Sequence, residues 1–112
     1  MNRRRFARVR ARLRFTFTWA EHFELFTTED LSASGALVAR HVPKSPLPPL
    51  HTVGECAFNL DGVEIRAEAR VVRLSRDGFA VKFNGLPRAV EDRIVGWVFR
   101  LEARVLSRRL PV

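Results

Sequence analysis

The stretch VRARLRFTFTW, residues 9–19, decides the fold class, because apolar and polar side chains alternate along it. One set of alternate positions is apolar throughout: Val9, Ala11, Leu13, Phe15, Phe17 and Trp19. The positions between them carry arginine or threonine. This period of two is typical of a β-strand with one face in a hydrophobic core. The pattern therefore predicts a strand over residues 9–19, with Arg10, Arg12 and Arg14 pointing outward.

The next part of the chain holds two shorter strands and a long connection. Phe23, Leu25 and Thr27 indicate a second strand, and the polar residues 28–34 indicate a loop after it. A third strand is expected over 35–39. Residues 41–52 contain four prolines, which cannot donate to a regular ladder, so we expect no secondary structure there.

A β-hairpin is the clearest signal in the second half. Residues 55–60 and 63–73 flank Asp61-Gly62, a pair that favours a type I′ turn. Its inner face is expected to consist of Val63, Ile65, Ala67, Ala69 and Val71. A second turn over 75–78 leads to a last strand over 79–83, which makes six strands in all.

One helix is expected to close the chain, over about 87–108. Pro87 suits a first helical position, and apolar residues then recur at three-to-four spacing: Val90, Ile94, Trp97 or Val98, Leu101 and Val105. Closure of six antiparallel strands removes exposed edges, and a helix can cover the open end. We therefore predict a mostly β fold, a six-stranded antiparallel barrel with a C-terminal α-helix. Residues 1–8 would be a flexible arginine-rich arm, and residues 9–112 the barrel with its helix.

Composition restricts the classes of protein that need to be considered. At 112 residues, 46% of them hydrophobic, the chain suits a single folded domain. No apolar run approaches the roughly 20 residues of a spanning helix, and no apolar stretch follows the N-terminal arginines. Cys56 is the only cysteine, which suits a reducing compartment. We expect a cytoplasmic protein without a membrane span.

The charge points to a phosphorylated or nucleobase ligand. The net charge is +8, and only Lys44 and Lys82 among the 20 basic residues are not arginine. The planar arginine fork pairs with phosphate and with the guanine O6/N7 edge. Four arginines cluster before the first strand, namely Arg3, Arg4, Arg5 and Arg8. A flexible arm of this kind could order itself around an anionic ligand.

A second cluster lies at Asp30-Leu31-Ser32-Ala33-Ser34-Gly35. The Asp30 carboxylate can accept hydrogen bonds from the N1–H and N2–H₂ donors of guanine, and Ser32 offers both a donor and an acceptor. Gly35 allows a backbone angle or a close approach that a Cβ would forbid. The same residues also suit an ordinary turn between two strands.

The two clusters together resemble the PilZ family, small bacterial domains that bind the second messenger cyclic di-GMP. Arg4 and Arg8 match the family's motif of two arginines separated by three residues just before the first strand. Asp30, Ser32 and Gly35 match its second motif. The resemblance extends to the turn and strand over 77–83 and to the final helix.

What the resemblance implies is a receptor that clamps cyclic di-GMP against the outside of the barrel, changes the conformation of its arm and relays the signal to an unknown partner protein. Arg4 and Arg8 would contact phosphate and guanine, with Arg3 and Arg5 in secondary roles. Asp30 and Ser32 would contact other guanine atoms, and Gly35 would keep the turn tight. The family binds one ligand or an intercalated pair, and we expect a pair, since Arg3 could stack on a second guanine.

Two other readings remain open. A basic barrel with Phe15, Phe17, Trp19 and Phe79 could bind single-stranded nucleic acid by stacking, although these aromatic residues alternate in phase with the core positions. The chain could also be a ligand-free protein-interaction adaptor. We expect no enzyme, no cofactor and no metal site, since His22, His41 and His51 have no cysteine or carboxylate neighbours at metal-ligand spacing.

Overall fold

Seven strands and one helix make up the computed structural model, which describes residues 8–109, the stretch 105–109 by its backbone alone. The elements are β1 (Val9–Arg10), β2 (Arg14–Trp19), β3 (His22–Leu31), β4 (Gly35–Arg40), β5 (Val53–Leu60), β6 (Val63–Leu74), β7 (Gly78–Phe83) and α1 (Arg88–Arg109).

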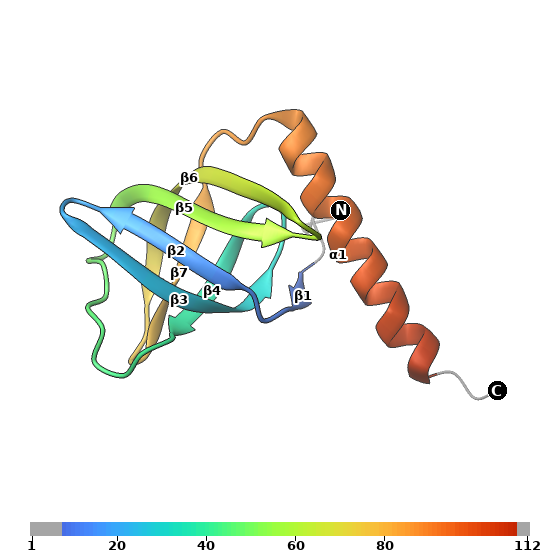
Figure 1. Ribbon diagram of the computed structural model, residues 1–112, viewed down its shortest axis with the longest axis horizontal. Coiled ribbons are helices and arrows are strands. Elements are labelled where there is room, and N and C mark those ends of the chain that lie inside the picture. Colours follow the sequence, from blue (N-terminus) through green and yellow to red (C-terminus); the bar gives the residue numbers. More distant parts are fainter. Residues whose placement is uncertain (1–7, 110–112) are drawn as a thin grey trace.

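Six of the strands close into a barrel (Figure 1). The order around it is β3-β2-β5-β6-β7-β4, and β4 pairs with β3 to complete the ring, all in antiparallel register. The prediction of a mostly β, six-stranded barrel with a C-terminal helix is therefore confirmed. The seventh strand, β1, adds two residues to the edge of β3 beyond the end of β2.

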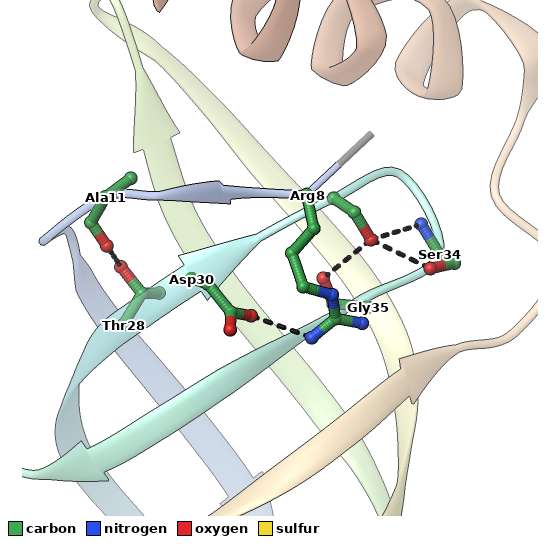
Figure 2. A network of polar contacts seen from close by, with 7 residues as sticks. Arg8, Ala11, Thr28, Asp30, Ser34 and Gly35 are labelled. Carbon is green, nitrogen blue, oxygen red and sulfur yellow. Dashed lines mark hydrogen bonds and ion pairs between the residues drawn. The ribbon is translucent and has the colours of Figure 1, made fainter. Parts of the chain in front are cut away.

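The single strand predicted over 9–19 is interrupted. β1 pairs Arg10 with Asp30, and β2 pairs Arg14 with Thr27, so residues 11–13 leave the regular ladder. Thr28 fills this gap with its side chain. Its hydroxyl accepts from the Leu13 N–H at 2.8 Å and donates to the Ala11 carbonyl (Figure 2). Arg10, Arg12 and Arg14 are exposed, as expected.

The prediction of a loop over residues 28–34 is wrong for residues 28–31, which belong to β3. β3 continues to Leu31 because it gains partners on both edges, β1 on one and β4 on the other. A bulge at Glu29 breaks the register with β4 and lets Thr28 and Leu31 both face inward. The alternating residues that indicated this strand, Phe23, Leu25 and Thr27, lie on its outer face, where Phe23 is 69% exposed.

The core is aromatic. Phe15, Phe17, Phe26 and Phe79 are almost completely buried, and Phe26 meets Phe79 edge to face at 4.8 Å between ring centroids. Such edge-to-face pairs are favoured by the ring quadrupoles. Trp19 is also buried, at 6% exposed. A stacking platform for nucleic acid would need four exposed aromatic residues, but all four face inward: Phe15, Phe17, Trp19 and Phe79.

The later strands follow the predicted hairpins. Asp61 and Gly62 both have positive φ, 50° and 85°, as a type I′ turn requires. The expected inner face is buried except at its first residue, Val63, which is 38% exposed. Residues 41–52 contain no strand or helix, also as predicted.

The helix covers one end of the barrel through Ile94 and Val98, which are buried in the core. Trp97 is half-buried, so Val98 is the better of the two positions left open in the sequence. Arg100 joins the helix to the β5–β6 turn through Asp61, at 3.5 Å. The C-terminal half of α1 extends beyond the barrel (Figure 1).

Candidate ligand-binding site

The two clusters from the sequence meet at the end of β3. Because β1 pairs with β3 with Arg10 opposite Asp30, the residue just before β1 lies over the same end of the strand. Nη1 of Arg8 lies 2.7 Å from Oδ1 of Asp30, and the two side chains are 43% and 21% exposed (Figure 2). The last residue of the predicted arm is therefore held against the acidic residue of the second cluster.

Ser32 holds the turn between β3 and β4. Its N–H donates to the Gly35 carbonyl at 2.9 Å, and its hydroxyl accepts from the Ser34 N–H at 3.2 Å. The two serine hydroxyls also lie 2.8 Å apart (Figure 2). Ser32 is only 1% exposed. In this conformation its polar atoms are used within the turn, and its predicted contact with guanine stays a prediction.

Gly35 is required by a close approach rather than by an unusual backbone angle. It pairs with Lys82 of β7, and a Cβ added to it would lie 2.1 Å from the Val81 carbonyl oxygen. Its φ is not positive, unlike those of Gly62 and Gly85. Of the two reasons for glycine considered from the sequence, the close approach holds.

A cavity of about 560 Å³ opens beside this turn, within the usual size range of small-ligand sites. Two of the predicted residues line it, Arg8 and Gly35. The sequence reasoning missed the rest of the lining, which comes from the turn and from the neighbouring strands β6 and β7: Ser34, Val72, Arg73, Ala80, Val81 and Lys82.

The missed residues are brought in by the register of the barrel. Asp30 pairs with Leu37, Leu37 with Ala80, and Ala80 with Arg73, so one row crosses β3, β4, β7 and β6 on the outer face. A single sequence gives no direct signal for such a row. The exposed charges of Arg73 and Lys82 near the ends of β6 and β7 were the available hint.

The main cavity is cationic. Arg8, Arg73 and Lys82 line it, and no carboxylate stands among the lining residues that the structure describes. A smaller cavity of about 290 Å³ adjoins it and shares Arg73 and Ala80 with it. The arrangement can take up an anionic group beside short side chains, with the Asp30 carboxylate at its edge as a hydrogen-bond acceptor.

The predicted site residues fall into two groups. Arg8, Asp30, Ser32 and Gly35 gather at one end of β3 and β4. Arg3, Arg4 and Arg5 lie outside the described residues, as does the rest of the arm over 1–7. Across residues 8–109 there is no group of three or more metal-ligating side chains. Burial raises the pKa of the Cys56 thiol to about 12, and Cys56 lies in the core.

Fold and site together define a small barrel domain with a basic ligand cavity on its outer surface. Residues 2–100 match the family model for the PilZ domain, and the chain belongs to this family. A comparison with curated proteins finds no significant relative. Within residues 8–109, no helix combines the length and apolar character needed to cross a membrane.

Several solved structures share the fold. The PilZ domain of CeSA from a cellulose-synthesizing bacterium is 26% identical, with a TM-score of 0.67 over 86% of this chain and 98% of that one. The PilZ domain of YcgR from Escherichia coli, solved with c-di-GMP, is 19% identical, with a TM-score of 0.73 over 97% and 100%. MotI/DgrA, an inhibitor of motility from Bacillus subtilis, is 14% identical, with a TM-score of 0.78 over 93% of this chain and 53% of that one.

Proposed function

We propose that this chain is a cytoplasmic, non-enzymatic receptor that binds cyclic di-GMP at the Arg8–Asp30 site. The observation that carries the proposal is the contact of the two motif clusters, 2.7 Å between Arg8 and Asp30, at the edge of a cationic cavity. Membership of the PilZ family and the likeness to a PilZ domain solved with c-di-GMP support the choice of ligand.

Each residue type has a chemical role in this proposal. Arg4 and Arg8 bind phosphate and the guanine O6/N7 edge, with Arg3 and Arg5 beside them. Asp30 accepts from the guanine N1–H and N2–H₂ groups. Arg8 uses only Oδ1 of the carboxylate, and a carboxylate has further lone pairs to offer.

The cavity lining adds two roles to those inferred from the sequence. Arg73 and Lys82 neutralise phosphate charge from β6 and β7. Ser32 and Gly35 act through the turn, Ser32 by its hydrogen bonds and Gly35 by allowing β4 to lie close to β7.

The ligand is proposed to bind as an intercalated pair. The adjoining cavity of about 290 Å³ supports this stoichiometry, because it provides a second depression that is also lined by Arg73. A guanidinium between two purines can stack on both.

Ligand binding is proposed to exchange the partner of Arg8 from Asp30 to the ligand and so move the arm. A partner protein would read the new position of the arm, and the downstream partner is not identified by any residue described above. This is a population shift driven by the different charge environment of Arg8 in the two states.

Isothermal titration calorimetry with cyclic di-GMP tests the proposal, run beside a single-stranded RNA of equal charge. We expect saturable binding of two ligands per chain and only weak, salt-sensitive binding of RNA. A tighter interaction with RNA, or no heat with cyclic di-GMP, would reject the proposed function. Binding of a single ligand would reject the pair alone.

A further inference from the structure

A second basic cavity lies at the other end of the β4–β7 strand pair. β4 begins at Gly35 beside the first cavity and ends at Arg40, about 16 Å further along at the usual rise per residue. The second cavity has a volume of about 520 Å³ and is lined by Arg40, His41, Pro43, Lys44, Arg76 and Asp77. None of these residues belongs to the proposed cyclic di-GMP site.

Arg40 builds this cavity by joining two loops. Its Nε donates to the Ser45 carbonyl at 2.9 Å, and its Nη1 donates to the Arg76 carbonyl at 3.2 Å. The same guanidinium lies 3.5 Å from the Asp77 carboxylate. The start of the proline-rich connection is thus tied to the β6–β7 turn, so the two walls of the cavity are held in place before anything binds.

The remaining cations are directed to solvent. Lys44 and Arg76 are exposed, and Lys44 has a φ of 67°, a left-handed conformation that a lysine rarely adopts. Asn or Gly would adopt this backbone more easily but would bring no charge to the cavity. Three cationic side chains, Arg40, Lys44 and Arg76, therefore line the cavity together with one carboxylate, that of Asp77, which is 75% exposed.

We propose that this cavity docks an acidic, extended segment of a partner protein. A peptide segment offers carboxylates to Lys44 and Arg76 and backbone N–H donors to Asp77. A phosphodiester backbone offers acceptors alone and would leave the Asp77 carboxylate without a donor from the ligand. Val42, beside the cavity in sequence and 53% exposed, adds an apolar contact that suits a peptide side chain.

The docking surface shares no residue with the first cavity. The two proposals can therefore fail separately. If both hold, the chain binds cyclic di-GMP at one end of this strand pair and an acidic segment at the other.

The test is an NMR titration of the ¹⁵N-labelled full chain with acetyl-hexaglutamate amide, beside inorganic phosphate and hexathymidylate. We expect the peptide to shift the amide signals of residues 40–42, 44, 76 and 77. The double variant Lys44→Gln/Arg76→Gln should weaken peptide binding at least fivefold. The double variant keeps the hydrogen bond that joins the two loops, because Arg40 donates to the backbone carbonyl of Arg76 and not to its side chain.

The matched control is Arg88→Gln/Arg93→Gln, which removes the same charge from exposed positions on α1. It should bind the peptide as the parent chain does. Equal weakening in both double variants, peptide shifts outside the cavity, or tighter binding of hexathymidylate than of peptide at these residues would overturn the proposal. Cyclic di-GMP titrated into the Lys44→Gln/Arg76→Gln variant should bind with unchanged affinity, which separates the two sites.

Discussion

Arg8 and Asp30 form an ion pair of 2.7 Å between the segment before the first strand and the end of β3. Both side chains are partly exposed, so the pair adds only about 0.2–1 kcal/mol to folding stability. Its importance lies in where it holds the two groups, at the edge of the cationic cavity. A ligand that binds there competes directly with this contact.

Loss of either partner should therefore affect binding far more than folding. Arg8→Ala and Asp30→Ala should each weaken cyclic di-GMP binding at least tenfold, since a hydrogen bond to a charged group contributes about 1.5–3 kcal/mol. Calorimetry gives the affinity, and urea unfolding should give stabilities within about 1 kcal/mol of the parent. Parental affinity in either variant would reject the assigned site.

Variants of Arg73 and Lys82 test the part of the site that β6 and β7 contribute. Arg73→Gln and Lys82→Gln should each lower cyclic di-GMP affinity and reduce its dependence on salt, because each removes one charge facing the phosphates. Arg93→Gln on the helix is the charge-matched control and should leave both quantities unchanged. If all three variants behave alike, the effect comes from net charge and not from the cavity.

Gly35 should tolerate no side chain. Gly35→Ala puts a Cβ 2.1 Å from the Val81 carbonyl oxygen, so β4 must move away from β7, at a cost of about 1–3 kcal/mol. Gly96→Ala is the control: the nearest atom to its new Cβ is Nη1 of Arg100 at 3.4 Å, and alanine favours a helix by about 0.5–1 kcal/mol. Chemical denaturation should thus show a lower free energy of unfolding for Gly35→Ala and a higher one for Gly96→Ala. Equal changes in the free energy of unfolding of the two variants would show that the close approach of β4 to β7 does not exclude a side chain at Gly35.

Thr28 should matter for stability through its buried hydroxyl. Thr28→Val removes the hydroxyl that bonds Leu13 and Ala11, leaving both backbone groups unpaired at a fully buried position. We expect a loss of about 1–3 kcal/mol and faster hydrogen exchange of the Leu13 amide. Thr16→Val is the comparison, because the Thr16 hydroxyl makes only a 3.4 Å bond to Ala57. A smaller loss at Thr28 than at Thr16 would contradict this assignment.

Cys56 gives the chain a defined loss of stability at alkaline pH. Burial raises the pKa of its thiol from 9.0 to about 12, so it stays protonated in the folded state while the unfolded state ionises above pH 9. Unfolding then releases a proton, and stability falls by about 1.4 kcal/mol for each pH unit between these values. The difference in unfolding free energy between the parent and Cys56→Ala, measured from pH 8 to 11, should show this slope. Parallel profiles would disprove it.

The strands were predictable wherever one face of a strand is fully apolar. Residues 9–19 alternate so regularly that their inward face follows from period alone, although the period does not show that residues 11–13 leave the ladder. Asp61-Gly62 defines its hairpin locally. The end of β3 could not be predicted in this way. Thr28, Glu29 and Asp30 are polar and resemble a loop, and they become a strand only because β1 and β4 pair with both edges.

The candidate site likewise has residues that the sequence pattern predicts and residues that only the strand pairing brings in. Arg8, Asp30, Ser32 and Gly35 are close in pattern to a known pair of motifs, so the sequence identified them. Arg73 and Lys82 reach the cavity only through the pairing of β4 with β7 and of β7 with β6. Which residues share a row around a closed barrel depends on its register, and the bulges at Glu29 and near Val72 change that register by one residue.

Two of the residues that line the first cavity, Gly35 and Ala80, have little or no side chain, so a bound molecule can approach main-chain atoms beside them. Those atoms are the same whatever the sequence. Selectivity among ligands must then come from the longer side chains of the site, Arg8, Arg73 and Lys82 in the lining and Asp30 at its edge, which can be exchanged without altering Gly35 or Ala80. In this barrel, the choice of ligand can be altered independently of the scaffold that presents it.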